Sequence, residues 1–336
     1  MHSESAEYVY AVGVDLMRVL VTGANGFVGG GLLQRLLGMA EVSVVAGLRH
    51  YGALDDTVVC ERCVLGDLAT SSFAAAQLDG IDVIVHTAAR VHVMRELEVD
   101  PLATFRQVNV AALRRLAGAA AQAGVRRFVF VSSIKVNGEE TMPGYAFMAG
   151  DVPTPMDPYG ISKQEAEQAL REICESSGME WVVVRPPLVY GPGVKANFQR
   201  LMQGLACGVP LPVGALHNRR SLVSLDNLVD LLVTCLTHPR AANQTFLVSD
   251  GNDLSVIELT KKLAQLLSSR SWLVPIPAAC LRVALNSVGR ASVAQRLCGE
   301  LRVDIEKNRS VLDWCPLTTV DEGLARTTAH YLECRP

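Results

Sequence analysis

The sequence predicts a doubly wound α/β sheet with a smaller second lobe, on the basis of three observations. The chain has 336 residues, enough for one large α/β domain with an appended lobe. Hydrophobic residues make up 49% and charged residues 19%, which suits a large buried core. Short runs rich in Val and Ile alternate with helical stretches through the first half of the chain, as buried parallel strands alternate with crossover helices.

The expected elements follow in order along the chain. The predicted strands are 18–21, 42–47, 58–65, 83–87, 128–132 and 181–185. The predicted helices between them include 29–37, 105–123 and 159–176. A helix over 226–236 and a strand over 245–248 are expected to return to the sheet, and further helices follow from residue 256.

Proline and glycine residues become frequent after Arg185 and indicate the start of a second lobe. We therefore expect a sheet domain over 17–187, joined by 223–250, and a smaller lobe over 188–222 and 251–332. Residues 1–16 are expected to be a disordered extension, with Met17 as a candidate start, since it lies directly before the first strand.

Net charge, cysteine count and apolar pattern disfavour several kinds of partner and location. A net charge of −3 gives no electrostatic reason to expect nucleic acid or an anionic membrane. Nine cysteines, an odd number in a long chain, favour a reducing compartment. Cys60 and Cys63 have no second pair at zinc-ligand spacing, so no metal site is predicted. With neither a signal-peptide pattern nor an apolar run long enough for a membrane span, we expect a soluble, cytoplasmic protein.

A glycine-rich turn directly follows the first strand. Three glycines at this place let the backbone approach a pyrophosphate, and the N-terminus of the next helix offers it unpaired N–H groups. The turn therefore predicts a Rossmann-type sheet that binds a dinucleotide. The expected contacts in this turn are Gly23, Asn25, Gly26, Phe27, Val28 and Gly29.

Residues after the next strands bear on the choice of dinucleotide. The second strand lacks the acidic residue at its end that typically binds the NAD ribose, and Arg49 stands there instead. Arg49 is suited to a 2′-phosphate, so NADP(H) is favoured over NAD(H), with both left open. Asp67, followed by Leu68, is placed to meet the adenine amine. Thr87, Ala88 and Ala89 are small enough at the end of the fourth strand to let a flat cofactor pass.

Tyr159 and Lys163 form the strongest chemical signal. They are four residues apart on a predicted helix and share a face, so the ammonium group can favour the phenolate. Ser133 ends the preceding strand and can hydrogen-bond the same substrate oxygen. This arrangement predicts an acid/base pair of Tyr159 and Lys163 with Ser133 beside it.

These motifs resemble the extended short-chain dehydrogenase/reductase family, the nucleotide-sugar epimerases, dehydratases and reductases, from Met17 to about Tyr331. The resemblance implies that the Tyr is the general acid/base, that the Lys holds the ribose, and that the Ser positions a sugar oxygen. It adds Asn109 and Pro186 to the cofactor contacts. It places Asn197 and one of Arg219 or Arg220 near the nucleotide diphosphate, and the spacing to Asp226 favours Arg219.

The sequence leaves two reactions open. Dehydratases of the family carry Asp-Glu after the serine position, whereas this chain has Ile134 and Lys135, so elimination is disfavoured. The missing acid and Arg49 favour a reductase. Residues 86–94 and 132–138 also resemble a bacterial branch of the family that reduces UDP-4-keto-6-deoxy-N-acetylhexosamines for surface polysaccharide, which implies a substrate of that class. The alternative is a UDP-glucose or UDP-N-acetylglucosamine 4-epimerase, and a catalytically dead dinucleotide sensor or scaffold is a remote third. Either His92 or Lys135 can be placed against the sugar. The family resemblance also implies a homodimer through 105–123 and 159–176.

Overall fold

The computed structural model describes residues 16–90 and 100–335 and contains a seven-stranded parallel sheet with helices on both faces. The strand order is β3-β2-β1-β4-β5-β6-β9. The strands are β1 (Met17–Thr22), β2 (Val42–Leu48), β3 (Glu61–Val64), β4 (Val83–His86), β5 (Arg127–Val131), β6 (Glu180–Arg185) and β9 (Gln244–Leu247). This arrangement confirms the predicted doubly wound fold.

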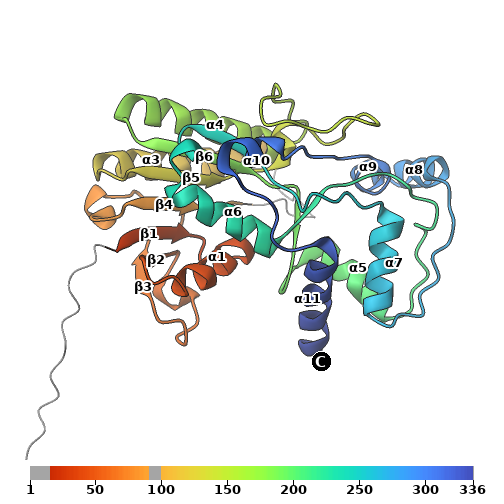
Figure 1. The fold of residues 1–336 in the computed structure, drawn as a ribbon. Helices are drawn as coiled ribbons and strands as arrows, with labels where there is room; N and C mark the ends of the chain where they lie inside the picture. The colour runs from red at the N-terminus through yellow and green to blue at the C-terminus, as the bar shows by residue number, and fades with distance from the viewer. Residues whose placement is uncertain (1–15, 91–99, 336) are drawn as a thin grey trace, which may run out of the picture.

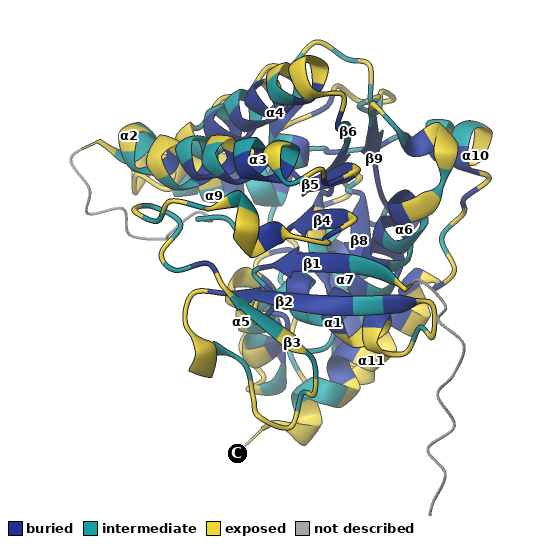
Figure 2. Cartoon of the chain, turned by 90° about the vertical axis from the view of Figure 1, so that its left-hand side faces the viewer, coloured by how far each residue is buried: buried dark blue, intermediate teal, exposed yellow. Residues whose placement is uncertain are grey.

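Two helical layers cover the sheet (Figure 1). One face carries α3 (Ala112–Gln122) and α4 (Pro158–Ser177), preceded by the short α2 (Pro101–Phe105) and a π-helical turn, Arg106–Ala111. The other carries α1 (Phe27–Leu37) and α6 (Leu225–Thr237), with α10 (Glu306–Leu312) near β9. Because successive strand residues point to opposite faces, Val83 and Val85 join one core cluster while Ile84 joins the other. The central strands accordingly lie buried between the helical layers in Figure 2.

The smaller lobe lies beside the carboxyl ends of the strands (Figure 1). Its elements are the paired strands β7 (Leu188–Tyr190) and β8 (Leu222–Ser224) and the helices α5 (Ala196–Ala206), α7 (Val256–Leu266), α8 (Ala278–Ser287), α9 (Ala291–Cys298) and α11 (Val320–Glu333). Tyr190 stacks on Phe198 within its core. The domain limits drawn from the sequence stay a prediction, although β9 does pair with β6 in the sheet.

Two elements differ from their predicted extent by more than two residues at one end. Strand β3 begins at Glu61 rather than at residue 58, because Thr57 and Val58 are held in a turn by hydrogen bonds to Asp55. The predicted helix 105–123 begins at Pro101 instead, where Asp100 caps it, and is widened by the π-helical turn. The predicted extension, residues 1–16, lies outside the described part except for Leu16.

None of the nine cysteines, all in described segments, forms a disulfide. Across residues 16–90 and 100–335, the helices are all too short or too polar to span a bilayer.

Candidate active site

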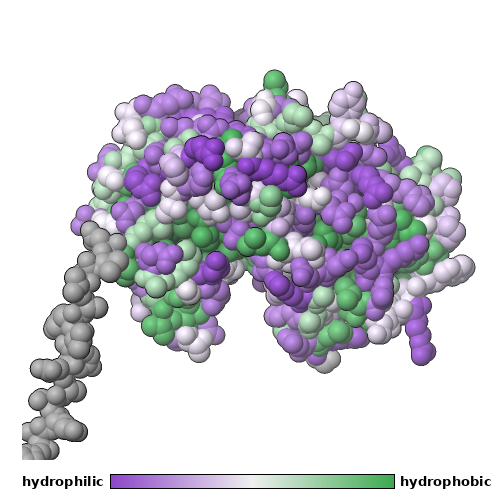
Figure 3. Space-filling model, viewed as in Figure 1, coloured by the Kyte–Doolittle hydropathy of each residue, from purple (hydrophilic) through white to green (hydrophobic). Residues whose placement is uncertain are grey.

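The carboxyl ends of the central strands bring the predicted site residues to one edge of the sheet. The chain runs outward from β1 to β3 and returns with β4 on the other side of β1, so a crevice for a ligand is expected between β1 and β4. The glycine turn follows β1, Thr87 follows β4, and Ser133 follows β5. In Figure 3 the surface is notched between the part that carries β1–β3 and the smaller lobe.

The glycine turn is built so that side chains would not fit at two of its positions. Gly23 has φ +69°, and a Cβ there would lie 2.9 Å from Ala88 Cα. A Cβ on Gly29 would lie 2.1 Å from the carbonyl oxygen of Gly23. These glycines therefore allow α1 to pack closely on the turn.

The same turn has the features that a pyrophosphate site requires. Gly26 is the exposed N-cap residue of α1, so the backbone there is open to a ligand. Phe27 and Val28 form the half-buried first turn of α1, which has no acidic residue, and Asn25 is exposed beside it. The helix N-terminus thus offers N–H groups and positive potential with no nearby carboxylate from its own first turn.

Arg49 and Asp67 meet at the ends of β2 and β3. Arg49 Nη2 lies 3.7 Å from Asp67 Oδ2, and both side chains are exposed. Asp67 Oδ1 also accepts the N–H of Ala69 at 2.8 Å. The carbonyl of Leu68 accepts a hydrogen bond from Arg115 at 2.6 Å, which fixes the turn. Part of the Arg49 charge is therefore already balanced within the protein.

The small residues after β4 lie against β1. Thr87 Oγ1 donates to the carbonyl of Thr22 at 2.7 Å, and Ala88 packs on Gly23. With Ala89, they leave little side-chain bulk at the end of β4, as the sequence predicts.

Asn109 is buried in the π-helical turn and uses both ends of its amide within the protein. Its Oδ1 accepts the N–H of Arg90 at 2.9 Å, and its Nδ2 donates to Ser162 Oγ at 3.0 Å. Asn109 therefore ties the segment after β4 to α4. A direct contact with cofactor stays a prediction.

The structure brings Ser133, Tyr159 and Lys163 together. Tyr159 lies in the first turn of α4 and is hydrogen-bonded to Ser133. Lys163, one turn later, donates to the carbonyl of Val131 at 2.9 Å, and its Nζ is 6.0 Å from the centre of the Tyr159 ring. The arrangement at the end of β5 can exchange a proton with a bound hydroxyl or carbonyl group.

Burial dominates the electrostatics of these groups. Burial raises the pKa of Tyr159 above its usual range, the charge of Asp157 raises it further, and the hydrogen bond from Ser133 opposes both. Burial lowers the pKa of Lys163 to about 7, against the attraction of Glu167. Burial and the nearby Lys163 together lower the pKa of His86 to about 3, so this imidazole is neutral.

A buried ion pair lies behind the candidate catalytic residues. Glu167 accepts two hydrogen bonds from Arg185, at 2.8 and 2.6 Å, and one from Ser132 Oγ at 2.6 Å. Arg185 Nη1 also donates to Asn137 Oδ1 at 2.9 Å. This network joins the ends of β5 and β6 to α4, the helix that carries Tyr159.

The predicted substrate contacts lie farther apart. Asn197 is exposed in the first turn of α5. Arg219 is half-exposed and forms an ion pair with Glu258 at 3.0 Å, while Arg220 donates to the carbonyl of Gly299. Pro186 is buried after β6, where its carbonyl accepts the N–H of Ile134.

The sequence interpretation missed three residues that support the site. Asp157 caps α4 by accepting the N–H of Gly160, and Asp-Pro before Tyr159 is a recognisable helix start. Glu167 stands four residues after Lys163, a helical spacing that also was readable. Its partner Arg185 ends the strand β6, and no spacing in the sequence connects the two residues. His92 lies outside the described residues.

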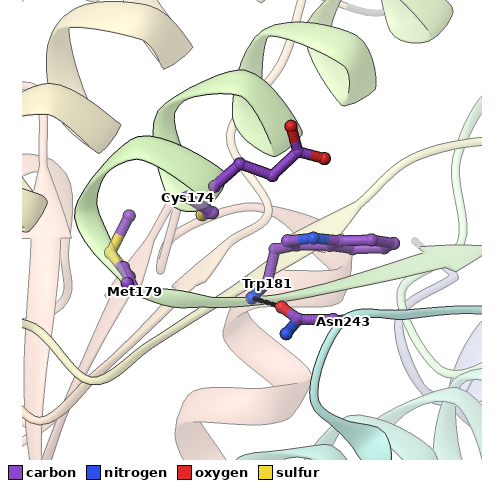
Figure 4. Close-up of a pocket in the computed structure, with 6 residues that line it drawn as sticks. Cys174, Met179, Trp181 and Asn243 are labelled. Carbon is purple, nitrogen blue, oxygen red and sulfur yellow. Dashed lines mark hydrogen bonds between the residues drawn. The ribbon is translucent and has the colours of Figure 1, made fainter.

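A separate hollow lies at the amino ends of the strands, near the start of β6 (Figure 4). Its lining includes Cys174, Met179, Trp181 and Asn243, and the backbone N–H of Trp181 donates to Asn243 Oδ1 at 3.2 Å. Burial raises the pKa of Cys174 to about 12, so the thiol stays protonated. This hollow contains none of the predicted site residues.

Comparison with known proteins gives a consistent result over almost the whole chain. The model of the NAD dependent epimerase/dehydratase family matches residues 19–249. A Vibrio cholerae protein named UDP-glucose 4-epimerase is 44% identical over 94% of this chain and 95% of its own length. A UDP-glucose 4-epimerase of Mycolicibacterium smegmatis is 30% identical over 94% of this chain and 98% of its own length.

Solved structures share the fold. A Thermotoga maritima UDP-glucose 4-epimerase with UDP-glucose superposes with a TM-score of 0.77 at 20% identity, over 94% of this chain and 99% of that one. A Bacillus cereus UDP-glucuronic acid 4-epimerase in complex with NAD gives 0.76 at 20% identity, with the same coverage.

Proposed function

The chain belongs to the NAD dependent epimerase/dehydratase family, and on this premise we propose that it is a 4-epimerase of UDP-hexoses. It is an enzyme of the extended short-chain dehydrogenase/reductase type. The 44% identical relative carries the name UDP-glucose 4-epimerase and aligns over 95% of its length. This likeness favours the epimerase over the 4-ketosugar reductase that the sequence alone favours.

The observation that carries the proposal is the grouping of Ser133, Tyr159 and Lys163 at the edge of the sheet that also holds the glycine turn. Oxidation and reduction of a sugar hydroxyl require a proton-transfer group beside a dinucleotide-binding site, here the glycine turn.

The residues act in two proton transfers. Tyr159, as phenolate, takes the proton of the sugar 4-hydroxyl while Ser133 donates a hydrogen bond to the same oxygen. After the ketosugar has presented its other face, Tyr159 returns the proton to that oxygen. In its charged form Lys163 would favour the phenolate, against the burial that raises the pKa of Tyr159. A bound nicotinamide dinucleotide supplies the hydride acceptor, and afterwards the donor, at carbon 4.

We propose NAD as the dinucleotide. The expectation of NADPH rests on Arg49, whose charge is partly balanced by Asp67 at 3.7 Å. An epimerase also needs a cofactor that stays bound through oxidation and reduction. The proposed cofactor contacts are those of the sequence prediction, with the glycine turn at the pyrophosphate and Asp67 at the adenine.

The second candidate is the reductase of a UDP-4-keto-6-deoxy-hexosamine. One observation favours it: β2 is followed by Arg49 and has no acid at its end. In that reaction Tyr159 delivers a single proton to the 4-keto oxygen, and the dinucleotide is exchanged after each turnover.

The proposal includes substrate contacts and an assembly. Arg219, released from Glu258, would meet the UDP diphosphate, with Asn197 beside it. Two copies would pair through α3 and α4, which form an outer layer of the molecule (Figure 1).

The test begins with the dinucleotide that leaves the purified protein on denaturation. Bound NAD, with conversion of UDP-glucose to UDP-galactose and no added cofactor, would support the epimerase. An empty site and NADPH oxidation by a UDP-4-ketosugar would support the reductase. Tight dinucleotide binding without turnover of either sugar class would leave only the sensor or scaffold.

A further inference from the structure

Lys135 lies two residues after Ser133 and forms an ion pair with Asp157 at the start of α4, the helix that carries Tyr159. It belongs to the short turn Ile134–Val136. Its Nζ donates to Asp157 Oδ2 and to Glu139 Oε1, the latter at 3.0 Å. The side chains are only partly exposed, 29% for Lys135 and 22% for Asp157, so water screens the pair less than it would an exposed one.

Asp157 connects this ion pair to Tyr159. Its other oxygen, Oδ1, accepts the N–H of Gly160 at 2.7 Å and so caps α4. The turn and the helix touch directly, since a Cβ on Gly160 would lie 2.9 Å from the carbonyl oxygen of Lys135. The negative charge of Asp157 opposes ionisation of Tyr159, the step that the acid/base role needs.

The charges around Tyr159 come from several elements. Lys163 approaches from α4 itself, and neutral His86 lies behind it on β4. Arg90 lies over Phe105, the ring that packs against Tyr159 from α2. The turn after β5 contributes Lys135 and Glu139. Within the described residues, Lys135 is the cation bonded directly to the carboxylate that opposes the phenolate.

We propose that Lys135 is a positioning residue that holds Asp157 as the cap of α4 and offsets its charge beside Tyr159. The inference rests on the proposed role of Tyr159 as acid/base. It assigns Lys135 a role through Asp157, in place of the direct sugar contact that the sequence also allowed.

The test compares charge-removing variants at both ends of the pair. In K135M the Asp157 charge is uncompensated, so the rise of kcat with pH that follows phenolate formation should move up by roughly one pH unit. In D157N, which keeps an oxygen to cap the helix, it should move down by a similar amount. The double variant K135M/D157N should return close to wild type, and K135R should retain the wild-type profile.

The matched control is K262M. Lys262 pairs with Asp321 at 2.6 Å between α7 and α11, so this variant removes a salt bridge of the same kind in the smaller lobe. Its pH profile should match that of the wild type.

A second readout separates this inference from the proposed reaction. Tyrosine labelled with ¹³C at Cζ, in protein loaded with NAD and without sugar, reports ionisation of Tyr159, assigned by its absence in Y159F. The K135M titration should again lie higher. If no UDP-sugar is turned over, the proposed function fails while this titration still tests Lys135.

Two results would overturn the inference. A K135M titration and pH profile equal to those of wild type would show that Lys135 does not act on Tyr159. A changed KM for UDP-glucose with an unmoved pH profile would assign Lys135 to the sugar instead.

Discussion

Replacing Glu167 by Gln should destabilise the protein by about 3–5 kcal/mol, because it breaks a buried ion pair at one end only. Glu167 and Arg185 have side chains 1% and 2% exposed. The carboxylate accepts hydrogen bonds from Arg185, Ser132 and Arg171. Glutamine keeps the shape but turns one acceptor into an N–H donor that faces a guanidinium, and it leaves that cation buried without its counter-charge.

The loss would be a large part of a typical unfolding free energy of about 5–15 kcal/mol. Urea unfolding followed by far-ultraviolet circular dichroism and by tryptophan fluorescence measures it. The matched control is E172Q, also on α4, because Glu172 pairs with Arg114 at 2.8 Å where both side chains are half-exposed. That variant should lose less than about 1 kcal/mol.

A loss below about 1 kcal/mol for E167Q would refute the reasoning. It would mean that the buried Arg185 charge is not strongly penalised when its counter-charge is removed. A double variant in which Glu167 and Arg185 are both replaced by Met should lose less than the sum of the two single variants, since no buried charge is then left unpaired.

Three further predictions use the same structure. Y159F should lower turnover by at least about 10³-fold and leave NAD affinity, measured by fluorescence titration, nearly unchanged; a fully active variant would sink the mechanism. G29A should lose NAD binding and several kcal/mol of unfolding free energy, because its Cβ would lie 2.1 Å from a backbone oxygen. Its control is G118A on α3, where a Cβ meets no other atom within 4 Å. That variant should gain up to about 1 kcal/mol of unfolding free energy in urea. The pKa of His86 is about 3 in the folded protein and about 6.5 in the unfolded chain, so the unfolded state takes up a proton first as the pH falls. The wild type should therefore lose roughly 4 kcal/mol of unfolding free energy relative to H86Q between pH 6.5 and 3. A difference in unfolding free energy that stays constant across that range would contradict this account.

The parallel sheet was predictable from the sequence because its strands are continuous apolar runs. Val83 to Val85, for example, are buried on both faces and read as a strand without knowledge of their neighbours. The start of β3 was not predictable in this way. Val58 has the composition of a strand residue, but the Asp55 turn takes its N–H out of the ladder.

The candidate site likewise has a part that was predictable from the sequence and a part that was not. Tyr159 and Lys163 are one helical turn apart, so their proximity follows from sequence spacing. Lys135 and Asp157 are brought together by the return of the chain to α4, and Glu167 on α4 meets Arg185 at the end of β6. The sequence did not show that Asp67, which follows a different strand, lies 3.7 Å from Arg49, and the preference for NADP(H) stays a prediction.

The pairing of β9 with β6 has a consequence for how the chain acquires its fold during synthesis. Strand β6 remains an open edge until β9 emerges, and α5, β7, β8 and α6 are made in between. At roughly 5–20 residues per second this interval lasts several seconds on the ribosome. During it, Val182 and Val184 and their unpaired backbone groups are exposed to other nascent chains. The last strand of the sheet thus sets how long this edge of the sheet stays open during synthesis.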